Sequence, residues 1–195
     1  METTLAQARL ILASGSPRRR ELLSHFGIPF AVIPSDVDEA CNGTGIAQVA
    51  MLALRKGADV ASTHPHLPVL SADTLVCLAD KVLGKPANAL DAEHMLSVLS
   101  GAWHQVHTGL CMRLPDGRLF ERVETTNVKF RTLSHAEIAR YIATGEPMDK
   151  AGAYAMQERG GMFVERIEGS PTNVIGLPLA ALAQVLTAAG LLTDG

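Results

Sequence analysis

The segment from Leu10 to Leu23, which reads LILASGSPRRRELL, constrains the fold more than any other part of the chain. Its apolar start predicts a buried strand over residues 10–13. Pro17 then suits the first position of a helix, because its fixed φ is helical and its missing N–H has no partner there. Ser16 is a natural N-cap residue. We therefore expect a strand, a tight Ser-Gly-Ser loop and a helix that opens with three arginines.

This loop has the features of an anion-binding site. Backbone N–H groups at a helix start and the hydroxyls of Ser14 and Ser16 can donate to an anion, and guanidinium groups match the geometry of phosphate. Arg19 shares a helix face with Leu22 and Leu23, because residues three and four apart are neighbours. An arginine that points inward needs a partner. Three solvated arginines are the alternative, but the inward Arg19 favours a polyphosphate-binding loop.

Composition limits the class of protein. The 195 residues are 47% hydrophobic, which is enough for a sizeable core and suits one domain, or one domain with a small lobe. A net charge of −3 argues against general binding of polyanions, so we expect no nucleic-acid partner. No apolar run reaches the roughly 18–20 residues of a membrane span. Three cysteines lie far apart without a C-x-x-C pair, which predicts reduced thiols and a cytoplasmic protein; they are Cys41, Cys77 and Cys111.

Hydrophobic periodicity and turn residues predict the remaining elements. Helices are expected over residues 46–62, 88–99, 134–143 and 178–191. Strands are expected over residues 30–33, 69–78, 101–112, 119–130 and 162–167. The Asp116-Gly117 pair predicts a hairpin, and Ser134 with Glu137 predicts a capping box. Residues 145–157 and 169–179 are expected to form loops.

Four charged residues stand out from their surroundings. Asp73 interrupts an apolar strand, where a carboxylate needs a partner and is often functional. Lys56 falls on the apolar face of its helix, which leaves open whether it reaches the surface or points to a phosphate. Lys85 is held in an extended loop by Pro86. Glu39 follows a strand in an acidic segment that is either a solvated turn or a source of a magnesium ligand.

Five short motifs follow one another along the chain: ASGSPRR from Ala13, SADT from Ser71, GKP from Gly84, DKAGAY from Asp149 and NVIGLPL from Asn173. Together they resemble the Maf family of nucleoside triphosphate pyrophosphatases, over about residues 10–191. The resemblance implies a single domain over residues 1–195 with a core over about residues 9–191. The resemblance implies an α/β fold with a long, curved mixed sheet flanked by helices around a central cleft, similar to inosine triphosphate pyrophosphatases. It also implies metal-dependent cleavage between the α and β phosphates, with Asp73 as general base.

The resemblance extends to a subgroup that acts on dTTP and UTP. That subgroup has arginine, threonine and glutamine at the positions of Arg18, Thr74 and Gln157. The subgroup that resembles 7-methyl-GTP pyrophosphatases tends to have tryptophan, glutamine and glutamate there. We therefore expect dTTP and UTP as substrates, with modified pyrimidine nucleotides as further candidates. The chain departs from the family at Glu158, where a glycine is usual.

Roles follow from these two lines of reasoning. We expect catalysis to depend on Asp73, Lys85 and Glu39, and a divalent cation (Mg²⁺ or Mn²⁺) to bind to Glu39 and Asp73. We expect Arg19 to hold phosphate, Arg18 to help choose the base and Arg20 to lie at the surface. The full set of expected substrate-binding residues is Ser14, Ser16, Arg18, Arg19, Lys56, Thr74, Asp149, Lys150 and Gln157. Look-alikes of this family are usually homodimers, so a homodimer is expected.

Two alternatives stay open at this point. The glycine-rich loop after the first strand is also found in sugar nucleotidyltransferases, but these have a second lysine soon after the arginine, and Lys85 is too far along. A nucleotide-binding regulator of cell division without turnover is the other alternative. The presence of Asp73, Lys85 and the Asp149–Lys150 pair argues against it.

Overall fold

The computed structural model describes residues 2–192. A 7-stranded mixed sheet has the order β2-β1-β3-β5-β6-β7, and β4 pairs with β3. The strands are β1 (Leu10–Leu12), β2 (Phe30–Val32), β3 (Val69–Leu78), β4 (Lys81–Leu83), β5 (Trp103–Arg113), β6 (Leu119–Phe130) and β7 (Val164–Glu168). The helices are α1 (Pro17–Ser24), α2 (Gly45–Thr63), α3 (Ala89–Leu99), α4 (His135–Ile142), α5 (Pro171–Ile175) and α6 (Leu179–Ala188).

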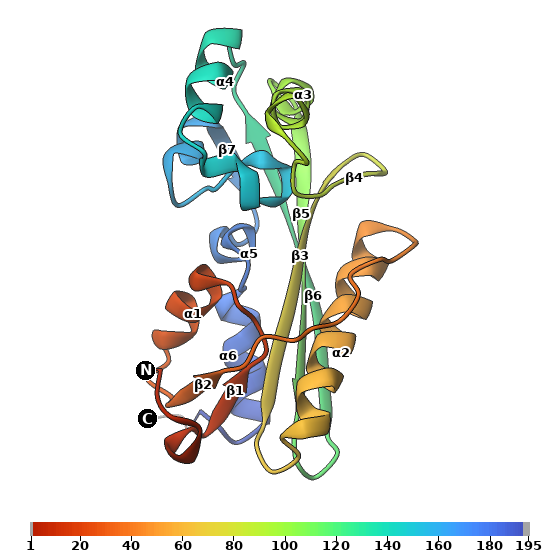
Figure 1. Cartoon of the computed structure of the whole chain (residues 1–195), viewed down its shortest axis with the longest axis vertical. Helices are drawn as coiled ribbons and strands as arrows, with labels where there is room; N and C mark the ends of the chain where they lie inside the picture. Colours follow the sequence, from red (N-terminus) through yellow and green to blue (C-terminus); the bar gives the residue numbers. More distant parts are fainter. Residues whose placement is uncertain (1, 193–195) are drawn as a thin grey trace.

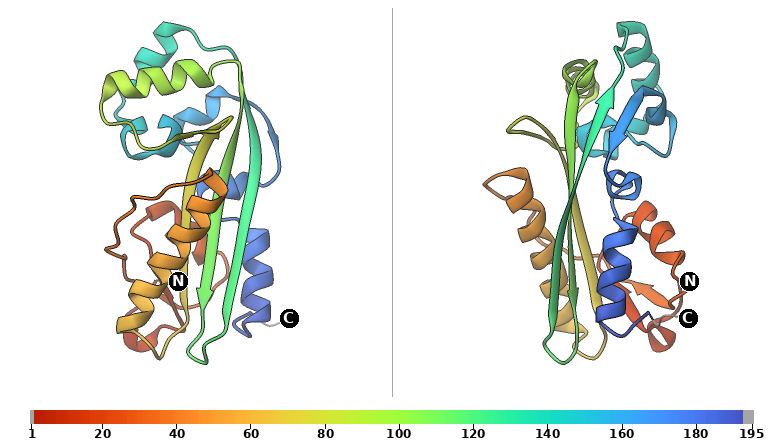
Figure 2. Two further views of the ribbon diagram at one scale, coloured as in Figure 1. Left: turned by 90° about the vertical axis from the view of Figure 1, so that its right-hand side faces the viewer. Right: turned by 180° about the vertical axis from the view of Figure 1, so that it is seen from behind.

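Three long strands, β3, β5 and β6, run along the whole molecule and join two lobes (Figure 1). In the lower lobe, α2 covers one face of the sheet, and α1 and α6 lie on the other (Figures 1 and 2). The upper lobe contains α3, α4 and β7. Each lobe has its own hydrophobic cluster, one around Leu23, Leu70 and Leu186 and the other around Leu96 and Phe130. No helix within residues 2–192 combines the length and hydrophobicity that crossing a bilayer requires.

The edge of β3 that faces β1 changes partner halfway along. Its lower end pairs in parallel with β1, up to Leu70. Its upper end pairs in an antiparallel manner with β4, from Val76. Among the described residues, no strand pairs with this edge between those two points. Asp73 and Thr74 lie in this gap, next to the point where the chain leaves β1.

Helix α2 packs unusually close to the sheet because a glycine lies beneath it. Gly109 of β5 is directly opposite Asp73 of β3. A Cβ at Gly109 would overlap the backbone carbonyl of Val49 in α2. The helix therefore rests on the sheet without an intervening side chain. This close approach brings Lys56, about two turns further along α2 than Val49, over Asp73.

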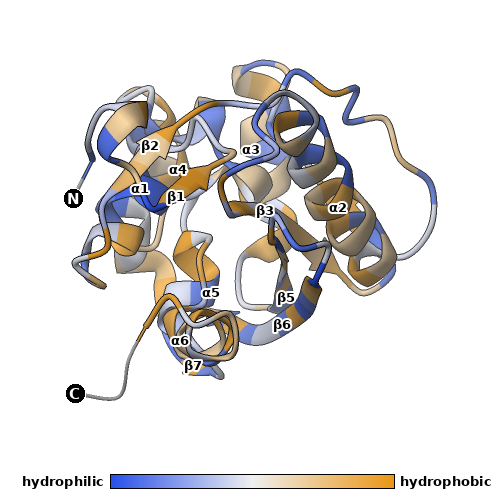
Figure 3. Ribbon diagram, turned by 90° about the horizontal axis from the view of Figure 1, so that it is seen from below, coloured by the Kyte–Doolittle hydropathy of each residue, from blue (hydrophilic) through white to orange (hydrophobic). Residues whose placement is uncertain are grey.

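Most of the expected elements are confirmed. Ser16 and Ser134 cap α1 and α4, and the Ser134–Glu137 capping box is present. The expected long mixed sheet with flanking helices is also confirmed. Hydropathy follows the fold, since the arginine-rich start of α1 is strongly hydrophilic beside the apolar β1 (Figure 3).

Two expectations near the C-terminus are wrong. The strand expected over residues 162–167 begins at Val164, because Arg159–Phe163 forms a 3-10 helix that the Gly160-Gly161 pair permits. The loop expected over residues 169–179 contains α5, which Ser170 caps and Gly176 ends in the left-handed conformation. Helix α1 ends at Ser24, and Phe26, which follows it, packs against the hydrophobic cluster of the lower lobe.

Candidate active site

A cleft of about 520 Å³ opens at the gap in the β3 edge, between the two lobes. This volume suits a small-molecule ligand. All of the residues singled out from the sequence line it, namely Ser14, Ser16, Arg18, Arg19, Glu39, Lys56, Asp73, Thr74, Lys85, Asp149, Lys150 and Gln157. The structure therefore brings the whole expected set together, while the individual roles stay predictions.

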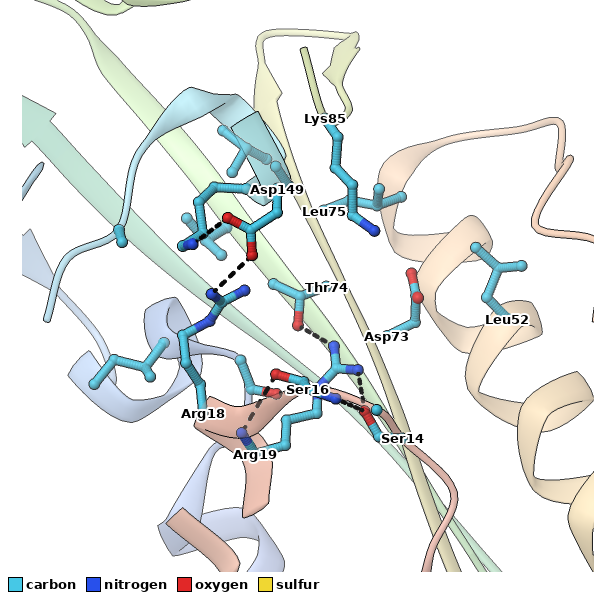
Figure 4. A pocket seen from close by; sticks show the side chains of 18 of the residues that line it. Ser14, Ser16, Arg18, Arg19, Leu52, Asp73, Thr74, Leu75, Lys85 and Asp149 are labelled. Carbon is cyan, nitrogen blue, oxygen red and sulfur yellow. Dashed lines mark hydrogen bonds and ion pairs between the residues drawn. The ribbon is translucent and has the colours of Figure 1, made fainter. Parts of the chain in front are cut away.

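The loop before α1 is shaped by its own hydroxyl groups. Ser16 Oγ accepts the N–H of Arg19 at 3.4 Å, which fixes the start of the helix. Ser14 Oγ accepts the N–H of Ser16 at 3.3 Å and a guanidinium N–H of Arg19 at 3.2 Å. Figure 4 shows both serines and Arg19 grouped on one side of the cleft. The loop is thus held in shape by hydrogen bonds within the chain.

Arg19 does point inward, and it joins three parts of the fold. Its Nε donates to the carbonyl of Gly176 at 2.9 Å, and its Nη2 donates to Thr74 Oγ1 at 3.0 Å. Burial lowers the pKa of Arg19, and the carboxylate of Asp73 acts in the opposite direction. Each terminal nitrogen carries two N–H groups, so each has a second donor beyond the contacts described. Arg19 can therefore bind an anion while it holds α1 against β3.

Lys56 lies between two carboxylates. Its Nζ is 2.6 Å from Glu39 Oε1 and 2.7 Å from Asp73 Oδ1. The side chains of Lys56 and Asp73 are 10% and 9% exposed, so this pair is buried, whereas Glu39 is 58% exposed. The hydrogen bond from Lys56 lowers the pKa of Glu39. In this arrangement Lys56 neither reaches the surface nor stands free for a phosphate, because it neutralises both acids.

The upper wall of the cleft carries charges of both signs. Asp149 accepts from Lys150 and lies 3.7 Å from a guanidinium nitrogen of Arg18, so it links the upper lobe to α1. Lys85 points into the cleft from the loop after β4 (Figure 4) and makes no ion pair within residues 2–192. Gln157 donates its side-chain amide to Glu158 Oε1 at 3.2 Å.

The charges of the cleft suit an anionic ligand. The lining holds five basic side chains (Arg18, Arg19, Lys56, Lys85 and Lys150) and three acidic ones (Glu39, Asp73 and Asp149). Within residues 2–192, no three histidine, cysteine or acidic side chains group as a metal site. The two carboxylates that contact Lys56, those of Glu39 and Asp73, are nevertheless hard oxygen donors that lie close together. Such a pair suits Mg²⁺ or Mn²⁺ when a phosphate ligand completes the coordination.

A family model described as Maf-like protein matches residues 9–189. The chain belongs to the Maf-like protein family. Curated Maf relatives include a dTTP/UTP pyrophosphatase of Methylobacillus flagellatus, which is 46% identical over 96% of this chain and 96% of its own length. Another, a dTTP/UTP pyrophosphatase of Myxococcus xanthus, is 48% identical over 95% of this chain and 94% of its own.

Solved structures resemble this Maf chain at the level of the fold. The Ham1 protein of Staphylococcus aureus aligns with a TM-score of 0.52 at 14% identity, over 93% of this chain and 98% of that one. A HAM1 protein of Coxiella burnetii gives 0.50 at 15%, over 93% of this chain and 99% of that one. The two-lobed architecture is therefore shared with proteins of very different sequence.

Sequence reasoning missed several residues that shape the Maf cleft. Tyr154 lines it, and His104, buried behind it, lies 2.9 Å from its hydroxyl. Tyr154 lies within a recognised motif, but nothing in the local sequence links it to His104, fifty residues earlier. The carbonyl of Gly176 holds Arg19. This contact has no sequence signal, because any residue carries a backbone carbonyl.

Proposed function

We propose that this Maf protein is a nucleoside triphosphate pyrophosphatase that converts dTTP and UTP to the monophosphate and pyrophosphate. The observation that carries the proposal is the convergence of a cationic phosphate loop, a buried carboxylate and a polar wall on one cleft. Relatives at 46% and 48% identity over nearly the whole chain carry that activity in their names. Modified pyrimidine nucleotides are further candidate substrates.

The triphosphate is held by the N-terminal loop. Its oxygens accept hydrogen bonds from the hydroxyls of Ser14 and Ser16 and from the remaining N–H groups of Arg19. Lys85 and Arg18 supply further positive charge from opposite sides of the cleft. Phosphoryl chemistry depends mainly on positioning and electrostatic stabilisation, which such fixed cations provide. In this proposal Thr74 orients Arg19 and does not contact the nucleotide base directly.

Asp73 accepts a proton from the attacking water. It lies at the floor of the cleft, where the ammonium group of Lys56 contacts it at 2.7 Å and fixes its position. Lys56 acts in this proposal by orienting Asp73 and Glu39. Glu39 and Asp73 would hold a divalent cation, which would supply neutralisation of the negative charge on the leaving pyrophosphate.

The pyrimidine base of the nucleotide lies against the upper wall of the cleft. Gln157 offers both a donor and an acceptor, which reading a pyrimidine edge requires. Asp149 and Lys150 close the cleft beside it. Lys150 is 8% exposed, so its side chain packs within the wall of the cleft and has little contact with solvent.

The test is a panel of canonical and modified nucleoside triphosphates with Mg²⁺ or Mn²⁺, with pyrophosphate and monophosphate quantified separately. The proposal expects the highest kcat/KM with dTTP and UTP and a one-to-one ratio of the two products. Release of orthophosphate, or equal rates with purine nucleotides, would contradict it. A parallel reaction with a sugar phosphate tests the nucleotidyltransferase alternative through formation of a nucleotide sugar.

Three further expectations accompany the proposal. A single catalytic domain is supported by one sheet that runs through both lobes. A cytoplasmic location is supported by the free cysteines Cys41, Cys77 and Cys111. Assembly as a homodimer is tested by sedimentation velocity, where the expected species has twice the mass of the 20.7 kDa chain.

A further inference from the structure

The upper wall of the cleft is built from a segment with little regular structure. Residues 145–160 contain only short 3-10 turns, at Glu146–Asp149, Ala151–Ala153 and the start of Arg159–Phe163. Yet this segment presents Asp149, Lys150 and Gln157 to the cleft. A side chain that reads a ligand must be held by its surroundings, so something outside regular secondary structure has to fix this wall.

One carboxylate gathers the two ends of the segment. Glu146 Oε1 accepts from the hydroxyl of Tyr141 at 2.8 Å and from the N–H of Gly160 at 3.0 Å. Glu146 Oε2 accepts from the N–H of Arg159 at 3.2 Å. Tyr141 in turn accepts the N–H of Ala155 at 3.2 Å. We call Glu146 and Tyr141 the clamp, since together they hold residues that precede and follow Gln157.

The clamp is strong for physical reasons. Hydrogen bonds to an ionised acceptor are roughly twice as strong as neutral ones. Tyr141 is 4% exposed, and its pKa is raised by burial and by Glu146, so it keeps the proton that it donates. The N–H of Ala155 is buried, and loss of its acceptor would leave an unpaired donor.

The clamp acts on the base-facing turn in particular. The N–H of Glu158 donates to the carbonyl of Ala155 at 3.3 Å, which closes a turn with Gln157 inside it. Both flanks of this turn end on the clamp, at Ala155 on one side and Arg159 on the other. Neither Glu146 nor Tyr141 lines the cleft, so the clamp touches no ligand directly.

We propose that Glu146 and Tyr141 are positioning residues that hold Gln157 and its turn in place for recognition of the nucleotide base. This inference rests on the proposed function, because it assigns the upper wall to the base. The phosphate loop lies in the other lobe and shares none of these contacts. Loss of the clamp therefore weakens binding of the base and leaves binding of phosphate unchanged.

The experiment compares two ligands that occupy different parts of the cleft. Dissociation constants for dTMP and for inorganic pyrophosphate are measured by calorimetry with the intact protein and Mg²⁺. The variants are Tyr141→Phe and Glu146→Gln, and the matched control is Glu165→Gln, an exposed acid on β7 outside the cleft. Loss of one charge-assisted contact predicts about tenfold weaker dTMP binding in both clamp variants. Pyrophosphate binding is expected to match the wild type.

Steady-state kinetics with dTTP and dCTP supply the second measurement. The clamp variants are expected to raise KM for dTTP more than they lower kcat, and to narrow the preference for dTTP over dCTP. Equal losses for dTMP and pyrophosphate, or unchanged dTMP binding, would overturn the clamp. Wild-type protein that binds both ligands but hydrolyses no nucleotide would instead overturn the proposed function. If Glu146→Gln does not fold, Tyr141→Phe carries the comparison alone.

Discussion

Asp73 combines burial with charge, and its immediate neighbours explain how the sheet tolerates it. The strand places this carboxylate in the gap between β1 and β4, where one side faces the cleft. Lys56 lies 2.7 Å away and compensates the charge. A buried acid with a single cationic partner and open access to a ligand has the geometry expected of a general base.

Asp73→Asn tests this role directly. The amide keeps the size of the side chain but cannot accept a proton, so turnover of dTTP is expected to fall by on the order of 100-fold or more. Binding of dTMP is expected to stay close to that of the wild type. Calorimetry and steady-state kinetics on the same preparation separate the two effects. Near-normal turnover would remove Asp73 from the mechanism.

Arg19 can be tested against its neighbour Arg20. Arg19→Lys removes the planar group that contacts both Ser14 and Thr74. Binding of dTTP is therefore expected to weaken at least tenfold. The measurement uses proteins that also carry Asp73→Asn, so that dTTP is not hydrolysed during it. Binding of thymidine is expected to change little. The control is Arg20→Lys, because Arg20 is exposed and pairs only with Glu2 at 3.3 Å among the described residues. Equal losses for nucleotide and nucleoside would make Arg19 purely structural.

Among the elements, α2 and β5 set the distance between Lys56 and Asp73. Gly109 allows this approach because nothing but backbone separates the helix from the strand. Two glycines on the α2 side of this contact also allow the close approach. A Cβ at Gly45 would overlap the side chain of Cys77, and a Cβ at Gly57 would overlap that of Ser71. The contact between Lys56 and Asp73 therefore depends on glycines, which have no side chain of their own.

Gly109→Ala is expected to destabilise the protein by about 1–3 kcal/mol, because the added methyl group forces α2 away from the sheet. Urea denaturation provides the measurement. Gly84→Ala is the control, since a Cβ there meets no atom within 4 Å. The folded Gly109→Ala protein is also expected to have a lower kcat than the wild type, because the displaced helix carries Lys56. Unchanged stability would mean that α2 does not rest on this glycine.

Local signals predicted the elements well wherever they were strong. Ser16 with Pro17 marked the start of α1, and Ser134 with Glu137 marked α4. The same Ser-Pro signature stands at Ser170, but the helix that follows has only five residues and was missed. The apolar Met162 and Phe163 suggested a strand where the backbone forms a 3-10 helix.

The sequence predicted which residues line the cleft, but not which of them contact one another. Ordered motifs identified nine of the twelve residues that line the cleft, and the other three, Glu39, Lys56 and Gln157, were expected from their sequence context or from the subgroup pattern. These patterns could not reveal that Lys56 pairs with Glu39 and Asp73, because this contact depends on how α2 crosses β3. The clamp around Glu146 was also beyond reach, since it relies on backbone N–H groups that every residue except proline carries.

For the molecule as a whole, His104 predicts a dependence of stability on pH. It is 2% exposed, and burial lowers its pKa from 6.5 to about 4. Below pH 6.5 His104 is protonated in the unfolded chain, whereas in the native state it is protonated only below about pH 4. The contribution of His104 is therefore complete above pH 6.5 and falls as the pH drops towards 4.

His104→Gln keeps a polar partner for Tyr154 but does not titrate. Wild-type stability is expected to drop between pH 7.5 and 4.5 by roughly 3 kcal/mol more than that of the variant, from about 1.4 kcal/mol per pKa unit. Denaturation midpoints at the two pH values provide the measurement. The burial-lowered pKa of His107 acts in the same direction in both proteins, so the double difference isolates His104. Parallel pH profiles would contradict the assignment.

The gap in the β3 edge also affects how the protein behaves in a crowded cell. A strand edge with unpaired backbone groups is a template for pairing with another chain and so a hazard for aggregation. Here β1 and β4 close the two ends of the open edge. The loop before α1 and the wall that carries Asp149 flank it. Within residues 2–192, the unpaired stretch of this edge is therefore only the short one between Leu70 and Val76, and so the arrangement that forms the cleft also limits the length of edge open to another chain.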